Sequence, residues 1–342
     1  RRHTNFSKEL IEQTINGTPG ASTRVTSTIS RNGDLVGRMY VRIAAGTVIQ
    51  QANAGMNVGH NMFDSTEVEI GGQLIDKHFG HFMEVHACLT EENPGTQATN
   101  TTPALANNPV ANSTKFQGMA LAGGVNVNAA QIALGDAHYV PLRFWFNRNP
   151  GLALPLIALQ YHEVKINLNF SAGYNDTGTT LYQNLSLWAE YIYLDTDERR
   201  RFAQVSHEYL IEQVQTQTSP VLVANGSVEL NFNHPVKELI WAGIANQAWG
   251  AANPGSGTLF AVDGIAPRDS NWGLKLNGHD RFAPQPISYF TRTQVWEHHT
   301  GCGAAAVPGR PAQARDATIA VYSFALKPEE HQPSGTCNFS RI

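Results

Sequence analysis

One stretch of the chain decides the fold, and it reads Asp195-Thr-Asp-Glu-Arg-Arg-Arg-Phe-Ala-Gln-Val-Ser-His-Glu-Tyr-Leu-Ile-Glu-Gln213. Its last four residues, Leu210-Ile-Glu-Gln213, repeat Leu10-Ile-Glu-Gln13, which stand 200 positions earlier. Four letters can recur by chance, so a duplication requires that other segments recur at a similar spacing.

Three further pairs of segments do recur at comparable spacings of about 203, 206 and 180 positions. They pair Arg24–Ile29 with Val228–Phe232, Val68–Gln73 with Leu274–His279, and Leu142–Asn147 with Tyr322–Lys327. Surface loops tolerate insertions, so two copies of one fold are expected to drift apart in this way. The pattern predicts a tandem duplication. Two unrelated β domains are the alternative, because short alternating strands resemble one another.

Length and composition bound the class of protein. A chain of 342 residues has room for two domains of about 150 to 200 residues each. Charged residues make up only 15%, while 30 glycines and 17 prolines supply turns, which is typical of an all-β protein. The net charge of −4 argues against direct nucleic-acid binding. The one basic run, Arg199–Arg201, lies beside Asp195, Asp197 and Glu198 and is expected to be a self-neutralised linker.

Three cysteines, Cys88, Cys302 and Cys337, are too few and too scattered for a disulfide framework or a Cys-x-x-Cys metal site. An odd count favours a reducing compartment, so we expect assembly in the host cytoplasm. Apolar runs fall short of the roughly 18 residues that span a bilayer. The chain begins Arg1-Arg2-His3 without methionine, and we expect it to be a fragment.

The first half predicts short strands in period-two alternation. Asn32-Gly33 between two such runs predicts a hairpin, because both turn residues tolerate positive φ. The next strand enters a tight turn at Gly71-Gly72. The expected strands are Arg24–Ser30, Leu35–Ile43, Val68–Ile70, Val140–Phe146, Val164–Phe170 and Leu187–Leu194, with an apolar run at Leu152–Leu159.

Two segments of the first half break this pattern. Residues 77–89 place Phe79, Phe82, Met83 and His86 at helical spacing, which predicts a short helix over one end of the barrel. Residues 93–137 show little periodicity and are expected to form a long functional or variable surface loop.

The second half repeats the style of the first. Its expected strands are Val228–Phe232, Leu239–Ala242, Leu274–Leu276 and Thr318–Leu326, and its expected loops are Trp249–Trp272 and Thr300–Arg315. Short strands joined by hairpins and long crossovers predict a β-sandwich with Greek-key connections, and hence an all-β tandem double jelly roll. We expect the first jelly roll over residues 1–197, a linker over 198–212 and the second jelly roll over 213–342.

Six strings of residues, spread in order along the chain, resemble the major capsid protein of nucleocytoplasmic large DNA viruses, and most closely its algal, phycodnavirus-type members. They are Arg1–Phe6, Ile29–Leu35, Glu69–Gln73, Leu154–Val164, Phe324–Pro328 and Gln332–Ile342. The resemblance runs essentially from end to end.

This resemblance implies a structural subunit of an icosahedral viral capsid, which forms pseudo-hexagonal homotrimers in the virion. It also implies a shell around an internal viral membrane, minor capsid proteins beneath it, and covalent glycans on outward loops. Members of the family carry a strand-forming segment before the position of Arg1 and continue past that of Ile342. We therefore expect the first jelly roll to lack its N-terminal strand and the second to be incomplete.

A group of histidines is the one feature of the sequence that suggests a metal site. His78, His81 and His86 lie near Glu84, but on a regular helix His86 points about 140° away from His81. The pattern matches no zinc signature, and packing or hydrogen-bonding roles are the better interpretation, also for His298-His299. No nucleophile elbow, phosphate-binding loop or Cys/His nucleophile context is evident. The sequence therefore predicts no enzyme, no cofactor and no catalytic or metal residue.

Nine Asn-x-Ser/Thr motifs occur, but in a chain rich in Asn and Thr most arise by chance, and no glycan site is assigned. They begin at Asn5, Asn16, Asn100, Asn112, Asn169, Asn175, Asn184, Asn225 and Asn338. Two rival functions stay open. One is a carbohydrate-binding β-sandwich with a ligand in its long loops, and the other is a metal-dependent jelly-roll enzyme.

Overall fold

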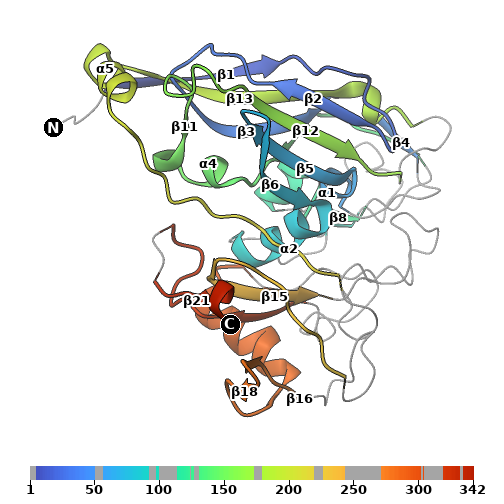
Figure 1. Cartoon of the computed structure of the whole chain (residues 1–342). Coiled ribbons are helices and arrows are strands. Elements are labelled where there is room, and N and C mark those ends of the chain that lie inside the picture. Colours follow the sequence, from blue (N-terminus) through green and yellow to red (C-terminus); the bar gives the residue numbers. More distant parts are fainter. Residues whose placement is uncertain are drawn as a thin grey trace.

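The computed structural model describes residues 5–50, 57–91, 98–99, 114–123, 125–126, 131–172, 179–218, 226–242, 271–301, 303, 319–331 and 334–342. Figure 1 shows a large β-sandwich formed by the first half of the chain and a smaller unit formed by the second half. Helix α2 (Gly80–Thr90) lies between them.

Sheet A of the sandwich is antiparallel and has the strand order β1-β13-β3-β10. Its strands are β1 (Phe6–Gln13), β13 (Leu185–Leu194), β3 (Leu35–Ile43) and β10 (His138–Pro141), with β11 (Leu154–Pro155) pairing to β3. Since strands distant in sequence are neighbours here, the chain crosses repeatedly between this sheet and the next.

Sheet B is also antiparallel, with the order β2-β12-β5-β6. Its strands are β2 (Arg24–Thr28), β12 (Val164–Phe170), β5 (Phe63–Ile70) and β6 (Gln73–Phe79). The strands predicted over 24–30, 35–43, 164–170 and 187–194 are thus confirmed within a few residues. Two four-strand paths with these crossovers form a jelly roll.

One continuous core fills the space between the sheets. Val41 and Ile43 of β3 are fully buried against Ile166 and Leu168 of β12 and Val25 of β2. Alternating side chains of both sheets point inward, as a β-sandwich requires.

The alternation predicted for residues 35–43 breaks at one end. The register between β13 and β3 shifts between Ala189 and Tyr191, so Val36 rather than Leu35 enters the main core. Leu35 instead packs in a separate cluster with Ala153 and Ile192. A bulge adds one residue to one strand and reverses the facing of the residues beyond it, which the sequence pattern does not reveal.

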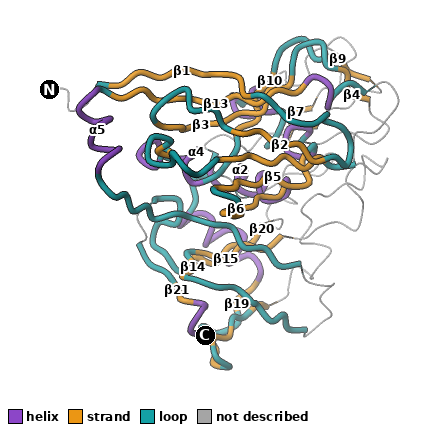
Figure 2. Tube along the Cα trace, turned by 45° about the horizontal axis from the view of Figure 1, so that its top comes forward, coloured by secondary structure: helices purple, strands orange, loops and turns teal. Residues whose placement is uncertain are grey.

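The predicted hairpin at Asn32-Gly33 is wrong. Strand β2 belongs to sheet B and β3 to sheet A, so this turn carries the chain from one sheet to the other. Figure 2 shows the two strands in separate layers. A Cβ at Gly33 would lie 2.9 Å from the Cβ of Tyr191, so glycine is needed for close approach rather than for a hairpin turn.

The helix predicted over 77–89 exists but begins later. Residues 77–79 belong to strand β6, and α2 starts at Gly80, where a Cβ would lie 2.5 Å from the carbonyl oxygen of His60. Two short helices, α1 (Val58–Asn61) and α3 (Lys115–Ala120), lie beside α2 at this end of the sandwich. Most of the predicted 93–137 loop lies outside the described residues.

The strand predicted over 140–146 is too long. Strand β10 ends at Pro141, and Trp145–Arg148 form helix α4, followed by a 3-10 turn at Pro150–Leu152. Trp145 and Phe146 are buried, so this apolar run fills the core from a helical turn. The apolar run at 152–159 likewise provides only the short strand β11.

The second unit is built of two-stranded pairs. The longest joins β15 (Glu238–Ala242) to β20 (Ile319–Ser323), and both match predicted strands. The other pairs are β14 (Pro235–Val236) with β21 (Cys337–Asn338), β16 (Asn271–Trp272) with β19 (Gln285–Pro286), and β17 (Lys275–Leu276) with β18 (His279–Asp280). A π-helical turn (Tyr289–Thr293) continues into α6 (Gln294–His298) and covers β20.

Short elements complete the described chain. They are β4 (Val48–Gln50) with β9 (Gln131–Ala133), β7 (Ala98–Thr99) with β8 (Val125–Asn126), a 3-10 turn at Tyr182–Asn184, α5 (Thr196–Gln204) and a C-terminal 3-10 turn at Phe339–Arg341. Among the helices described here, none is long and apolar enough to cross a bilayer.

The junction after the sandwich consists of α5 and an extended segment. Asp195 caps α5, and Arg199 pairs at 3.0 Å with Asp34 of the sandwich rather than with its acidic neighbours. The extended segment, residues 205–218, is here called the strap, and Figure 1 shows it running from α5 across the molecule to the second unit. Residues 228–232, predicted as a strand, are extended but form no strand ladder in the described structure.

Candidate functional site: an open groove and the joint beside it

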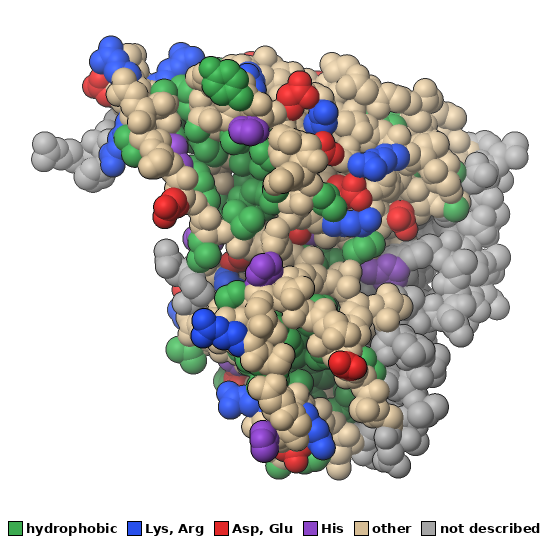
Figure 3. Space-filling view, viewed as in Figure 1, with side chains coloured by type: hydrophobic (Ala, Val, Ile, Leu, Met, Phe, Trp, Pro, Cys, Tyr) green, Lys and Arg blue, Asp and Glu red, His purple; other side chains and the backbone are tan. Residues whose placement is uncertain are grey.

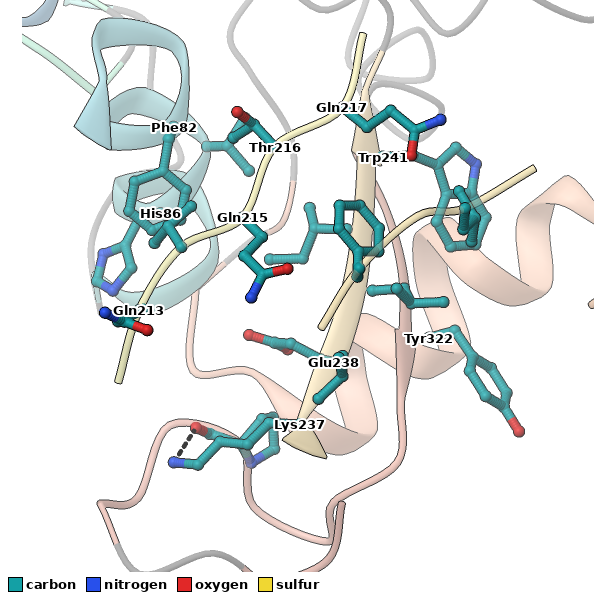
Figure 4. Close-up of a pocket in the computed structure, with 18 of the residues that line it drawn as sticks. Phe82, His86, Gln213, Gln215, Thr216, Gln217, Lys237, Glu238, Trp241 and Tyr322 are labelled. Atoms are coloured by element: carbon teal, nitrogen blue, oxygen red, sulfur yellow. Dashed lines mark hydrogen bonds between the residues drawn. The ribbon is translucent and has the colours of Figure 1, made fainter. Parts of the chain in front are cut away.

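An open groove of 3380 Å³ lies between the sandwich and the second unit. The strap forms one wall, residues 226–242 form another, and α2 closes the end nearest the sandwich. Figure 3 shows hydrophobic side chains in the lower half of the molecule, and Figure 4 shows polar side chains, among them Gln215, Gln217 and Glu238, that line the groove. The groove is several times larger than a typical small-molecule site.

Two glutamines of the strap form hydrogen bonds across the groove to the wall formed by residues 226–242. The side-chain amide of Gln215 donates to the carbonyl of Asn233 (3.1 Å) and accepts from the same residue's N–H (2.8 Å). Gln217 likewise donates to the carbonyl of Glu229 and accepts from the N–H of Asn231 (2.6 and 3.0 Å). Side chains thus occupy the backbone positions that an adjacent β-strand uses, which explains why residues 228–232 lack a ladder.

An aromatic cluster forms the groove's floor. Trp241 of β15 lies 5.2 Å from Phe290 and 6.0 Å from Trp272 between ring centroids, and Phe282 lies 4.8 Å from Tyr322. The indole nitrogen of Trp241 is buried without a partner in the described structure. Phe290 is buried, but the other rings are only partly covered, although apolar surface of this extent is normally buried.

A charged triad lies at the edge of the groove. The imidazole of His299 places Nε2 3.0 Å from Glu238 and Nδ1 3.1 Å from Glu329, and its side chain is 1% exposed. Burial alone lowers the pKa of His299, but the hydrogen bonds to both carboxylates outweigh it and raise the pKa to about 9. His299 is therefore a cation at neutral pH and ties α6 to β15 and to the loop after β20.

Glu212 of the strap links the two units. Its carboxylate pairs with Arg148 of α4 at 2.9 Å and with Lys237 of the second unit. Next to it, Gln213 donates to the carbonyl of Ile75, and the N–H of Val214 donates to Asp76 at 3.1 Å. These bonds fasten the strap along β6, which is otherwise an open sheet edge.

The contact between the sandwich and the second unit is here called the joint, and it is formed by the strap and by helix α2. This helix is buried on two sides. Met83 belongs to the sandwich core, whereas Val85, Cys88 and Leu89 pack with β15, β20 and Val295 of α6. The chain after α6 approaches the end of α2 so closely that a Cβ at Gly301 would lie 2.4 Å from the Cys88 carbonyl oxygen. The backbone N–H of Gly301 donates to the carbonyl of Leu89 (2.7 Å).

The histidines singled out in the sequence do not share a helix face. His78 lies on β6, fully buried, and stacks on Phe144 with ring centroids 4.7 Å apart. His81 and His86 lie on α2, and burial lowers the pKa of His81 to about 4. Within the described residues, no group of three or more His, Cys, Asp or Glu side chains could hold a metal ion.

Sequence reasoning missed a buried polar network around His60. Its Nδ1 lies 2.6 Å from the carboxylate of Glu84, which also accepts the N–H of Gly123 at 3.1 Å. The amide of Gln117 donates to the carbonyl of Gly123 at 2.7 Å. These contacts hold α1, α2 and α3 together. His60 carries no motif signal, because its partner lies 24 positions away.

Five of the nine candidate glycan motifs begin on residues that the structure describes and that solvent reaches at least in part: Asn5, Asn16, Asn169, Asn184 and Asn338. Those at Asn100, Asn112, Asn175 and Asn225, like Cys302, lie outside the described residues.

Jelly-roll sandwiches occur in proteins of many functions, and the family models assign this one to a single class, the structural capsid proteins. The N-terminal family of major capsid proteins matches residues 1–195, and the large eukaryotic DNA virus major capsid protein family matches residues 198–342. The chain belongs to the major capsid proteins of large eukaryotic DNA viruses.

Individual relatives agree. The chain is 44% identical to the major capsid protein of Pyramimonas orientalis virus over all of this chain and 82% of the relative. It is 37% identical to that of Paramecium bursaria Chlorella virus 1, over 100% and 78%. Among solved structures, PBCV-1 VP54 matches with a TM-score of 0.72 and 36% identity, over 100% of this chain and 83% of that one.

A more distant structure supports the fold alone. The Faustovirus major capsid protein has a TM-score of 0.65 at 14% identity. The predicted all-β, tandem double jelly-roll class is confirmed. The chain is a structural subunit of a viral capsid, located in the virion, and a shell built of such subunits requires that copies associate.

Proposed function

We propose that three copies of the chain form a pseudo-hexagonal capsomer, which tiles an icosahedral shell. The observation that carries this proposal is that two strand pairings of the sandwich have counterparts in the second unit. In the sandwich β3 pairs antiparallel with β10 and β5 forms a hairpin with β6, while in the second unit β15 pairs with β20 and β17 forms a hairpin with β18. Three subunits of two similar domains supply six similar lobes, which suits a hexagonal lattice position.

The same comparison supports a second jelly roll over residues 213–342, joined by a linker at 198–212 to a first one over 1–197. The equivalent of β1 is the strap, which carries the repeated Leu-Ile-Glu-Gln motif. In the sandwich, β13 lies between β1 and β3, whereas the space between the strap and β15 is the groove. The groove has the position, the apolar floor and the free backbone groups that sandwich strands need.

Subunit contacts need exposed surface, and β1 supplies one stretch of it. It is an edge strand of sheet A, and Phe6 and Leu10 on its outer side are 58% and 43% exposed. Edge strands with exposed apolar side chains readily join other chains. A second copy of this protein is the occupant that a shell-forming subunit implies.

Light scattering and electron microscopy of the purified protein test the proposal. We expect a homotrimer that weakens when Leu10→Lys adds a charge to the outer side of β1. The matched control is Ser7→Lys, an exposed position on the opposite side of the same strand. A protein that stays monomeric under assembly conditions refutes the trimer, and equal weakening by both variants refutes the contact at Leu10.

Further partners follow from the family. We propose minor capsid proteins beneath the shell, an internal viral membrane on its inner side, covalent glycans on outward loops and assembly in the host cytoplasm. Pull-down from infected-cell extracts and intact-mass measurement of virion protein test the protein partners and the glycans respectively.

A further inference from the structure

The strap is held on the sandwich by polar contacts to β6 and to α4, and one histidine lies beside them. His86 of α2 lines the groove, and Figure 4 shows it beside Gln213 of the strap. Its ring lies 5.6 Å from that of Phe82, and its Nδ1 lies 3.1 Å from the hydroxyl of Thr90. The strap therefore lies over a half-buried imidazole whose polar partner is a neutral hydroxyl.

Two arginines and two histidines face His86. They come from the segment before α4, from α4, from β6 and from the turn after α6, and they are Arg143, Arg148, His78 and His299. The two arginines have their own counterions, since Glu91 pairs with Arg143 and Glu212 with Arg148. A proton on His86 would add a further positive charge to this group without a carboxylate of its own.

From this cluster we propose that the strap is an acid-sensitive latch, in which protonation of His86 releases residues 209–217 from the sandwich. The latch opens by breaking the bonds of Gln213 and Val214 to β6 and the pair between Glu212 and Arg148. Opening gives His86 access to water and separates the strap side of the groove from α2.

The direction of the effect follows from proton linkage. Burial first, and then the charges of Arg143, Arg148, His78 and His299, hold the pKa of His86 well below its usual 6.5 while the latch is closed. The open form, with His86 in water, binds the proton more readily. Opening is therefore favoured about fivefold over the first pH unit below 6.5 and about tenfold per unit below that, as long as the closed form stays unprotonated.

Hydrogen exchange of the whole chain measures this opening. The Val214 N–H donates to Asp76 at 3.1 Å only while the latch is closed, so the protection factor of peptide 209–217 reports it. Between pH 6.5 and pH 5.0 we expect that factor to fall about 15-fold after correction for the intrinsic exchange rate. Peptides of β3 and β13 should keep their protection.

Variants at His86, with His279→Gln as the control, test whether His86 controls the latch. His86→Gln, or His86→Phe if the first does not fold, should remove the acid response, and His86→Lys should open the latch already at pH 7. His279→Gln, on an exposed hairpin of the second unit, should respond like the parent protein. The proposal is overturned if His86→Gln or His86→Phe keeps the fall of about 15-fold. It is equally overturned if the protection factor of peptide 209–217 in the parent protein does not fall with pH. Loss of protection in β3 and β13 together with the strap would also overturn it.

Discussion

Removal of the His299 imidazole should destabilise the second unit in a strongly pH-dependent manner. The pKa of His299 is raised from 6.5 to about 9 by the hydrogen bonds to Glu238 and Glu329, which outweigh the opposing effect of burial. A rise of this size corresponds to about 3 kcal/mol of stabilisation of the folded form. Because the histidine side chain is 1% exposed, solvent screening takes little from this value.

The sign of the pH effect is fixed by the direction of the shift. A raised pKa means that the folded protein binds the proton more tightly than the unfolded chain does. The stabilisation is therefore complete below pH 6.5 and is lost progressively as the pH rises to about 9. The His299→Gln variant should be about 3 kcal/mol less stable than the parent at pH 6.5 and nearly equal to it above pH 9.

Urea denaturation followed by hydrogen exchange in peptides of β15 and β20 measures this difference for the second unit itself. His279→Gln, an exposed substitution in the same unit, is the control and should leave the free energy of unfolding within about 0.5 kcal/mol. The reasoning is refuted if His299→Gln costs the same at both pH values, since the imidazole would then act by packing and not by charge.

Three further substitutions in the sandwich have defined outcomes, all measured by urea denaturation. Gly59→Ala would place a Cβ 1.9 Å from the carbonyl oxygen of Ala120, so a loss of about 3 kcal/mol or more is expected, and a loss below about 1 kcal/mol would contradict the close approach. Ile43→Ala removes a fully buried side chain and should cost about 2 to 5 kcal/mol, whereas a neutral result would mean that β3 does not face the core. Tyr191→Phe removes a hydroxyl that donates to the Ser30 carbonyl at 2.6 Å and should cost about 1 to 2 kcal/mol, and an unchanged midpoint would show that water replaces this bond.

The strands of the sandwich were predictable where one face is buried and the other is exposed to solvent. Residues 35–43 and 164–170 alternate because a sandwich strand shows every second side chain to the core. The prediction failed where the chain fills the core by other means. Trp145 and Phe146 enter it from a helical turn, and Leu35 leaves it through a bulge, and neither device changes the local composition.

Most of the contacts that form the joint could not be predicted from the sequence. Glu212 belongs to the repeated motif, but its partners Arg148 and Lys237 lie 64 positions before it and 25 after it. His299 was seen only as half of a pair of histidines, because the carboxylates that charge it come from two other elements. Ion pairs between distant residues leave no periodic signal, so only coordinates can find them.

By itself, the sequence determined that this chain is all-β and built of two similar halves, and its resemblance to capsid proteins stands. Those properties rest on alternation, turn residues and a repeated motif. Such patterns are local in the sequence, so they can be recognised without knowing which residues are neighbours in space. The tertiary structure alone decided that Asn32-Gly33 joins two sheets, that α2 is shared by both units, and that the strap is bonded to β6. Each of these depends on which surfaces meet in space, and that choice is made by the packing of the whole chain.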